Sequence, residues 1–151
     1  MIVYRITNEI YKTDLSGNGA ALAGSRWNSR GVRLLYTSQF ISLCILESLV
    51  HLKRQYIPAS QYLLHIKIPG DKNILEITAD KIRKDWHREI DYTQWMGDHF
   101  IQNKQSLVLK VPSAIVPQES NFLLNPFHDD FKKVTIISAE LLELDKRLME
   151  Y

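Results

Sequence analysis

The sequence predicts an α+β fold: a single domain, residues 1–151, with a mixed, mostly antiparallel β core flanked by helices. Strand-like and helix-like segments interleave irregularly, without the uniform crossover spacing of a doubly wound parallel sheet. The 151 residues are 45% hydrophobic, which is enough for one core. No repeat, linker or low-complexity tract divides the chain.

The N-terminal third is expected to hold two strands and a helix, separated by a long loop. Ile2–Ile6 predicts the first strand and Val32–Ser38 the second. The nearly continuous apolar run Phe40–Arg54 predicts a mostly buried helix. Between the strands, Thr7–Gly31 is polar and bears glycines, and loops of this length are usually functional or disordered.

The middle of the chain mixes both element types. Gln61–Pro69 alternates apolar and polar side chains, which predicts a strand with one core face. After a Pro-Gly-Asp turn, Asn73–Thr78 predicts a short strand and Ala79–Trp86 a brief helix.

The next helix is expected at Tyr92–Asn103. Asp91 is its expected N-cap, since a glutamine follows three residues later as in a capping box. Two further strands are expected at Leu107–Val111 and Val134–Ser138.

Two C-terminal stretches are less regular. Pro112–His128 combines turn-forming residues with an unusual density of hydrogen-bonding side chains. In the tail, Glu140–Met149 fits a short helix by propensity, whereas Leu141–Leu144 equally fits an edge strand, and periodicity does not choose between them.

Composition and charge exclude several classes of protein. The net charge of +2 is far below the basic excess of a nucleic-acid-binding surface. The five histidines are too dispersed for a paired metal-ligand motif, so no metal site is expected. With no apolar run long enough for a membrane span and no signal-peptide pattern, we expect a cytoplasmic protein.

The glycine-bearing loop is the first candidate binding segment. Arg26 stands between Gly24 and Trp27, and Arg5 ends the first strand. The planar fork of an arginine can bind a diphosphate through two hydrogen bonds, which a lysine cannot reproduce. The alternative is an ordinary surface loop with solvated or salt-bridged arginines.

Three further residues are candidates for chemistry. Glu47 lies within the apolar helix, where a carboxylate needs a partner or a function, although Glu47, His51 and Arg54 could instead form a solvated stripe. Tyr36 could stack on a ring or simply pack. Ser113 lacks the glycine elbow of a hydrolase nucleophile, so a hydrogen-bonding, orienting role is favoured.

Taken together, short motifs along nearly the whole chain resemble the RES domain family. The motifs are Gly17-x-Gly19-Ala20, Gly24-x-Arg26-Trp27-Asn28, Tyr36-Thr37-Ser38, Glu47 through His51, Val111-Pro112-Ser113, Glu119-x-Asn121, Leu124-Asn125-Pro126-x-His128 and Asp145-x-Arg147-Leu148. By position, the resemblance implies a catalytic set and a set that binds NAD. The catalytic set is Arg26, Glu47, Ser113 and Tyr36, and the NAD-binding set is Arg5, Arg26, Tyr36, Trp27, Asn28 and Asn125.

The same resemblance implies a function. RES proteins resemble ADP-ribosyltransferase toxins in fold and act as toxins of bacterial toxin–antitoxin pairs. The expected reaction is cleavage of NAD between nicotinamide and ribose, with water or inorganic phosphate as acceptor. NAD would be a substrate, with no permanently bound cofactor, and the expected partner is an antitoxin with an Xre-like helix-turn-helix.

Three alternatives to NAD degradation remain open at this point. The first is a protein ADP-ribosyltransferase toxin that uses NAD as donor. The second is an RNA-cleaving toxin in which Glu47, His51 and an arginine act on a phosphodiester. The third is a nucleotide-binding module without catalysis.

Overall fold

The structure is a computed structural model that describes residues 1–51, 60–70 and 74–149. All the strands it assigns join one seven-stranded sheet in the order β4-β5-β6-β2-β1-β3-β7. The strands are β1 (Ile2–Asn8), β2 (Leu35–Ser38), β3 (Gln61–Lys67), β4 (Ile74–Glu76), β5 (Val108–Pro112), β6 (Ser120–Leu124) and β7 (Thr135–Leu141). Only the β4–β5 pair is parallel, so the predicted mixed, mostly antiparallel α+β architecture is confirmed.

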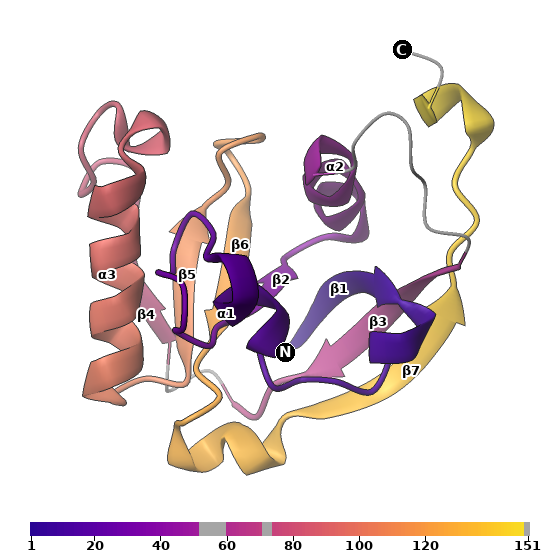
Figure 1. The fold of residues 1–151 in the computed structure, drawn as a ribbon, viewed down its shortest axis with the longest axis horizontal. Coiled ribbons are helices and arrows are strands. Elements are labelled where there is room, and N and C mark those ends of the chain that lie inside the picture. Colours follow the sequence, from indigo (N-terminus) through magenta and orange to yellow (C-terminus); the bar gives the residue numbers. More distant parts are fainter. Residues whose placement is uncertain (52–59, 71–73, 150–151) are drawn as a thin grey trace.

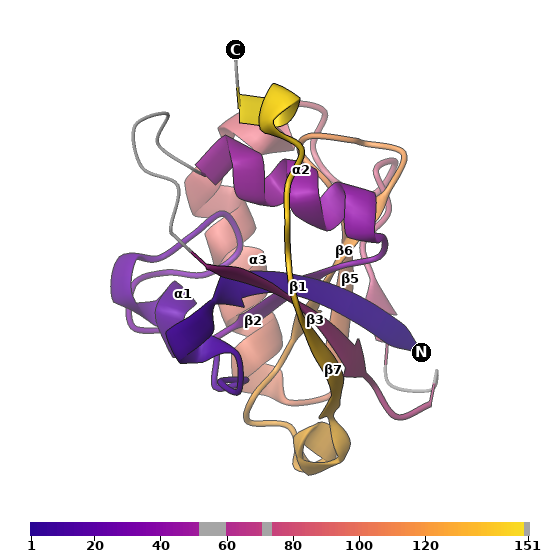
Figure 2. The same ribbon diagram turned by 90° about the vertical axis from the view of Figure 1, so that its right-hand side faces the viewer.

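The helices lie on and around this sheet (Figure 1). The α-helices are α1 (Asn18–Ala23), α2 (Ile41–His51) and α3 (Ile90–Asn103), and the 3-10 turns are η1 (Glu9–Tyr11), η2 (Trp86–Arg88), η3 (Asp129–Lys133) and η4 (Lys146–Met149). Figure 2 shows α2 crossing above the strands and β7 running along the outer edge of the sheet.

The sheet is weakest at its centre, where β1 meets β2. These strands share a single register pair, Tyr4 with Ser38, whereas β1 pairs with β3 along its whole length. On either side of this junction the two parts of the sheet diverge, and α2 lies over the place where they part (Figure 1).

Two apolar clusters stabilise the sheet and the elements packed on it. One contains residues from both outer and central strands, among them Val3, Leu35, Leu64, Ile66, Val108 and Leu124. The other packs beside α3 and includes Trp27, Leu34, Trp86, Phe100, Leu109 and Leu123. Since burial of such side chains contributes most of the favourable free energy of folding, the first cluster joins the two parts of the sheet and the second fixes α3 to β5 and β6.

Several predicted elements differ from those observed. The loop Thr7–Gly31 contains the short helix α1, and the stretch Pro112–His128 contains the strand β6. In β6 the last three residues are all buried, because β5 and β2 flank the strand and both faces are covered. Such a strand shows no alternation, which is why the sequence pattern missed it.

Two predictions around the third helix were wrong. The helix predicted at Ala79–Trp86 is instead a series of turns that leads into η2. The backbone N–H groups of Lys81 and Trp86 each bond to the carbonyl oxygen three residues earlier, and Ile82 and Trp86 are buried in the core. Asp91 is not the N-cap: α3 begins at Ile90, and Asp91 lies in the first turn, where a carboxylate complements the helix dipole.

The tail and the second helix also differ from expectation. Thr135–Leu141 continues as the edge strand β7 on β3, so neither the predicted helix Glu140–Met149 nor the strand Leu141–Leu144 is formed as such. A 3-10 turn follows at Lys146–Met149. The predicted end of the second helix at Arg54 lies outside the described residues, and α2 is described as far as His51.

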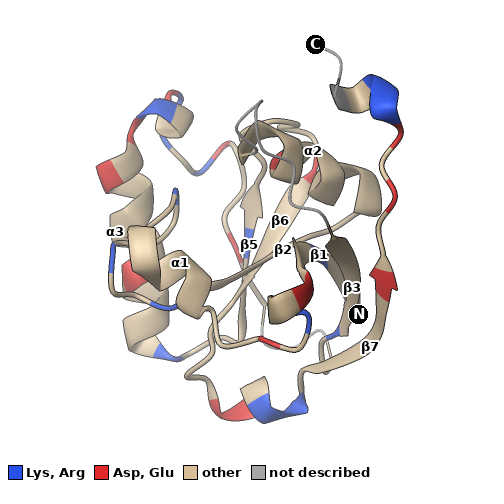
Figure 3. Ribbon diagram, turned by 45° about the vertical axis from the view of Figure 1, so that its right-hand side comes forward, with Lys and Arg blue, Asp and Glu red and all other residues tan. Residues whose placement is uncertain are grey.

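Charged residues of both signs are dispersed over the fold (Figure 3). Within the described ranges, basic and acidic positions often adjoin, as in η3, where Asp129 and Asp130 precede Lys132 and Lys133. No helix of the described part of the chain is long and apolar enough to cross a membrane.

Candidate active site

A pocket of about 550 Å³ lies where β1 and β2 part, beneath α2. Its walls come from six elements: β1, the α1 region, β2, α2, β3 and β6. The polar and titratable residues that line it are Arg5, Asn8, Ser25, Tyr36, Thr37, Ser38, Cys44, Glu47, Ser48, His51, Gln61 and Asn121. This pocket therefore brings together Arg5, Tyr36 and Glu47, three of the residues predicted from the sequence.

Glu47 is held by two hydrogen bonds to one of its oxygens. The Ser113 hydroxyl donates to Oε1 at 2.8 Å, and the Asn121 amide Nδ2 donates to the same atom at 2.6 Å. The other oxygen, Oε2, has no hydrogen bond to any described residue. Glu47 is thus a carboxylate with one anchored oxygen and one oxygen available to a ligand.

Ser113 acts on Glu47 and is itself fully buried. Its Oγ accepts the backbone N–H groups of Ile115 and Val116 at 3.0 and 3.1 Å. Because these bonds occupy the acceptor side of the hydroxyl, its proton is directed to Glu47. Ser113 thus contacts Glu47 without lining the pocket, and its orienting role stays a prediction.

Arg5 presents a cation where β1 and β2 part. Its Nη1 donates to the carbonyl oxygen of Tyr36 at 3.5 Å, while Nε is buried without a hydrogen-bond partner among the described residues. Burial lowers the pKa of Arg5, and the nearby Asp14 and Cys44 act in the opposite direction. An arginine nonetheless stays protonated in proteins, so this side chain is a fixed positive charge with spare donor capacity.

Tyr36 joins the pocket to the glycine-bearing loop. Its hydroxyl accepts the backbone N–H of Trp27 at 3.0 Å and donates to Oδ1 of Asn28 at 2.8 Å. Burial raises the pKa of Tyr36, so the phenol remains protonated at neutral pH. The hydroxyl is therefore committed to the loop, and only the ring contributes to the pocket wall.

Trp27 and Asn28 form the scaffold of the loop, outside the pocket lining. Asn28 is fully buried, and its Nδ2 donates to the carbonyl oxygens of Ala20, Ser29 and Val32. Trp27 packs in the core with its ring 5.6 Å from that of Trp86. Both side chains hold the loop in shape, and neither faces the pocket.

Arg26 is directed away from the pocket. Its Nη1 donates to the carbonyl oxygen of His87 at 2.6 Å, and its guanidinium carbon lies 5.7 Å from the Trp86 ring centroid. Its neighbour Ser25 does line the pocket. The structure thus directs the Arg26 side chain toward His87 and Trp86, and Arg26 does not line the pocket.

Helix α3 clamps this loop through side chains that sequence reasoning did not single out. Thr93 Oγ1 donates to the carbonyl oxygen of Arg26 at 2.5 Å, and Gln94 Nε2 donates to that of Ser25 at 2.8 Å. The Asp98 carboxylate accepts the N–H of Ser29 at 2.9 Å. Gln94 and Asp98 are four residues apart and so lie on one face of the helix, with Thr93 at the adjacent position, which is the available sequence signal.

Asn125, the last predicted binding residue, lies in the core. It is fully buried, donates to the carbonyl oxygen of Ile101 at 3.1 Å and accepts the N–H of Phe127 at 2.9 Å. The structure therefore brings it into the turn after β6 and not into the pocket. Asn121, four residues earlier, is the asparagine that reaches the pocket, and sequence reasoning did not select it as a site residue.

Two other titratable residues line the pocket from α2. His51 is exposed at the last described turn of the helix, and Cys44 is buried facing β1 and β2. Burial raises the pKa of the Cys44 thiol to about 11, although hydrogen bonds from Ile6 and Ser38 and the charge of Arg5 oppose the shift. Cys44 is thus a neutral thiol near neutral pH.

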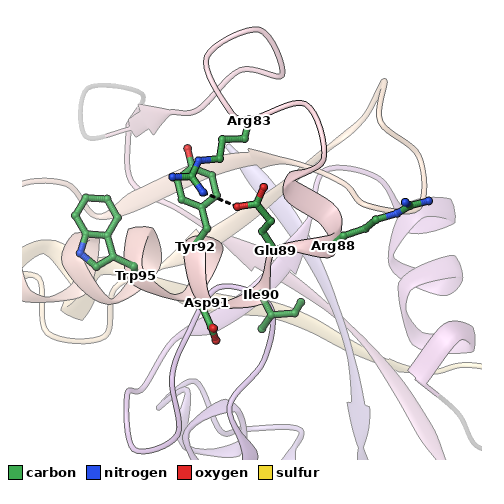
Figure 4. Close-up of a pocket in the computed structure, with 7 residues that line it drawn as sticks. All are labelled: Arg83, Arg88, Glu89, Ile90, Asp91, Tyr92 and Trp95. Carbon is green, nitrogen blue, oxygen red and sulfur yellow. Dashed lines mark hydrogen bonds and ion pairs between the residues drawn. The ribbon is translucent and has the colours of Figure 1, made fainter.

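A larger depression of about 750 Å³ lies at the start of α3 but lacks converging polar groups (Figure 4). Arg83 points toward Glu89, with which it forms an ion pair at 2.5 Å, and its guanidinium lies 4.3 Å from the Tyr92 ring centroid. Arg88 and Trp95 point away in different directions (Figure 4). The polar groups here are paired or divergent, which favours the pocket beneath α2 as the site.

The described residues contain no cluster of histidine, cysteine and acidic side chains that could hold a metal ion. The chemistry available in the pocket is that of a carboxylate, an arginine, an aromatic ring and several amides and hydroxyls. Such a set can bind an anionic, polyhydroxylated ligand and stabilise a positive charge that develops close to Glu47.

The sequence matches the family described as RES domain over residues 2–145. Among curated relatives, the chain is 37% identical over 155 aligned positions to a protein named Toxin Res from Photorhabdus laumondii, covering 99% of this chain and 98% of the relative. It is 35% identical to a Prs ADP-ribosylating toxin from Sphingobium sp., covering 90% and 87%. A Toxin Res from Pseudomonas putida is 31% identical, covering 98% and 99%.

The fold is also similar to that of a solved structure. The crystal structure of the M. tuberculosis MbcT–MbcA toxin–antitoxin complex contains a chain that superposes with a TM-score of 0.67 at 18% sequence identity. The match covers 99% of this chain and 86% of that one. At this identity the likeness establishes a shared fold.

Proposed function

The chain belongs to the RES domain family, and from this premise we propose that it is the toxin of a bacterial toxin–antitoxin pair that cleaves NAD between nicotinamide and ribose. The observation that carries the proposal is the hydrogen bonding of the Glu47 carboxylate. Its Oε1 is anchored by Ser113 and Asn121, and its Oε2 is free of described partners inside a pocket that also contains Arg5.

Cleavage of the nicotinamide–ribose bond develops positive charge on the ribose. The C–N bond breaks with its electron pair going to nicotinamide, and the ribosyl carbon passes through a cation-like state before an acceptor oxygen attacks and loses its proton. A preorganised carboxylate stabilises such a charge, because it needs no reorientation at the moment of reaction. In this proposal Glu47 has that role.

Each of the other predicted site residues is assigned to one part of NAD or to the support of the loop. Arg5 binds the diphosphate, supported by its buried, unpartnered Nε. Tyr36 offers its ring to nicotinamide, since its hydroxyl is bound to the loop. Arg26 joins the diphosphate after releasing the carbonyl of His87, and Trp27 and Asn28 support this loop from behind.

The acceptor determines the class of product. Water gives ADP-ribose and inorganic phosphate gives a phosphorylated ADP-ribose, and both reactions degrade NAD. A second candidate is transfer to a protein side chain, which is favoured by the 35% identity to a relative named Prs ADP-ribosylating toxin. All three acceptors use the same cleavage step at Glu47.

The proposed partner is an antitoxin with an Xre-like helix-turn-helix. The solved structure that shares this fold is that of a toxin–antitoxin complex, which supports an antitoxin as partner. Co-expression with the adjacent open reading frame, followed by co-purification, tests this part of the proposal.

The experiment that tests the reaction is product analysis with purified protein freed of any partner. NAD is incubated with the protein in phosphate-free buffer, with added phosphate, and with a cell extract as protein acceptor. We expect nicotinamide release in at least one condition, and the ADP-ribosyl product identifies the acceptor. Intact NAD in all three conditions contradicts the proposal.

A further inference from the structure

We propose that Asn121 is a positioning residue for the Glu47 carboxylate and that Ser38 sets the orientation of the Asn121 amide. The inference rests on the proposed cleavage of NAD at Glu47, which it extends to residues of β2 and β6. Three hydrogen bonds connect these side chains: Ser38 donates to Asn121, Asn121 donates to Glu47, and Ser113 donates to Glu47.

The sheet register places Ser38 and Asn121 side by side. They are directly opposed partners in the antiparallel β2–β6 pair, so their side chains project from the same face of the sheet. Both also line the pocket beneath α2, the helix that carries Glu47. Two strands and a helix therefore meet at this point.

The direction of each hydrogen bond follows from the chemistry of the groups. An ionised carboxylate only accepts hydrogen bonds, so the NH₂ group of Asn121 faces Glu47, at 2.6 Å from Oε1. The amide oxygen then faces Ser38, whose hydroxyl donates to it at 2.8 Å. If the amide turned over, its oxygen would face the Glu47 oxygen, and the two acceptors would repel each other.

Two donors on the same oxygen restrict the rotation of the carboxyl group. Ser113 approaches from the segment after β5, and Asn121 approaches from β6. With either donor alone, the carboxylate could pivot about a single hydrogen bond, and Oε2 would lose its fixed direction. Asn121 thus contributes the second point of attachment and contacts the catalytic group rather than the reacting bond.

The decisive variant is Asn121→Asp, which keeps the side-chain shape and replaces the NH₂ group by oxygen. Two carboxyl groups in contact cannot both ionise readily, so the pair retains a proton whose pKa is raised. While that proton is present, it can replace the lost N–H donor to Glu47. When it leaves at higher pH, the two carboxylates repel each other and Glu47 is displaced.

The measured quantity is kcat for nicotinamide release across about pH 5 to 9, expressed as the ratio of Asn121→Asp to wild type. We expect this ratio to fall steadily as pH rises. The other titratable groups facing the site are Arg5 from β1, Tyr36 from β2, and Cys44 and His51 from α2. Since these groups are present in both proteins, the ratio removes their shared contribution.

Two apolar substitutions test how far kcat depends on the orientation of the Glu47 carboxylate. Asn121→Leu has a similar volume and no donor, and kcat is expected to fall by about 100-fold, the scale of a misplaced reacting group, with a smaller change in KM. Ser38→Ala leaves the amide free to turn over and should lower kcat by a smaller factor. Ser42→Ala, on an exposed position of α2, is the matched control and should leave kcat unchanged.

A spectroscopic measurement tests the same geometry without turnover. In an NMR spectrum, the Asn121 amide proton bound to Glu47 should lie downfield and move upfield in Glu47→Gln. A pH-independent activity ratio, full kcat in Asn121→Leu or an unchanged amide resonance in Glu47→Gln each overturns the positioning role. If the wild-type protein releases no nicotinamide, the proposed function is contradicted. The NMR result then still decides whether Asn121 positions Glu47.

Discussion

The backbone of Gly97 on α3 lies directly against the carbonyl group of Trp27. A Cβ atom at position 97 would overlap the Trp27 oxygen, so a residue with a side chain requires the loop or the helix to move. Around this contact, Thr93, Gln94 and Asp98 bind the loop by hydrogen bonds. The position of the arginine-bearing loop therefore depends on this close approach of two backbones together with the three hydrogen bonds around it.

Gly97→Ala is expected to destabilise the protein despite the higher helix propensity of alanine. Inserting a methyl group into a packed contact typically costs about 1–3 kcal/mol. The measurement is the free energy of unfolding in urea. Gly19→Ala is the control, since nothing lies within 4 Å of a Cβ at that helical position, and there we expect no loss. Equal stability of Gly97→Ala and the wild type would mean that the loop does not rest on α3 in this way.

Tyr36→Phe removes the hydroxyl that joins Trp27 and Asn28. The variant leaves a buried N–H without its acceptor, a loss of about 1–3 kcal/mol in the free energy of unfolding. Tyr62→Phe removes a hydroxyl that makes one exposed, 3.5 Å contact with Glu9, and should change stability by less than about 0.5 kcal/mol. Similar urea midpoints for the two variants would contradict the bridging role of Tyr36.

Arg5→Lys keeps the positive charge of the pocket but loses the planar fork and the buried Nε. We expect KM for NAD to rise by at least about tenfold, because a lysine cannot bind a diphosphate in the same bidentate geometry. Arg30→Lys, at an exposed position of the neighbouring loop, is the matched control. An unchanged KM in Arg5→Lys assigns the diphosphate to another group.

Cys44 is expected to make the free energy of unfolding fall as pH rises through the alkaline range. Burial raises the pKa of its thiol to about 11, whereas the pKa of a cysteine thiol in the unfolded chain is about 8.5. The unfolded state therefore loses its proton first, and stability should fall as pH rises from about 8.5 to about 11, by up to about 3 kcal/mol. The measurement is the difference in unfolding free energy between wild type and Cys44→Ala across this range, and a constant difference would contradict the shift.

The overall architecture could be predicted because the strands with one covered face show alternation. β3 is an example: Leu64 and Ile66 are buried on one face, while His65 and Lys67 are more exposed. β6 could not be found in this way because Phe122, Leu123 and Leu124 are buried on both faces. Its position between β5 and β2 is a long-range property that no local pattern contains.

The site could be predicted in part. Arg5, Tyr36 and Glu47 line one pocket, and Ser113 contacts Glu47, as the family resemblance suggests. The sequence could not distinguish asparagines that face the pocket from those that hold the backbone. Asn28 and Asn125 are buried with their amides bound to the main chain, whereas Asn121 reaches Glu47 because of its register opposite Ser38.

Arg26 illustrates a second limit of sequence reasoning. Its position beside the pocket follows from the loop, but the direction of its side chain is set by the carbonyl of His87 and the ring of Trp86, about sixty residues away. Those partners belong to η2, of which only Trp86 lies within the helix predicted at Ala79–Trp86. The role of Arg26 at the diphosphate remains a prediction that requires the side chain to move.

The central claim is that the carboxylate of Glu47, anchored by Ser113 and Asn121, drives the cleavage of NAD. The most direct measurement is the rate of nicotinamide release by Glu47→Gln, beside Glu143→Gln as an exposed control and with the unfolding midpoint of each variant. The account predicts a folded Glu47→Gln protein whose rate has fallen by at least about 100-fold, the scale of losing a preorganised charge-stabilising group, and a control with the wild-type rate. A Glu47→Gln protein that releases nicotinamide at the wild-type rate would contradict it.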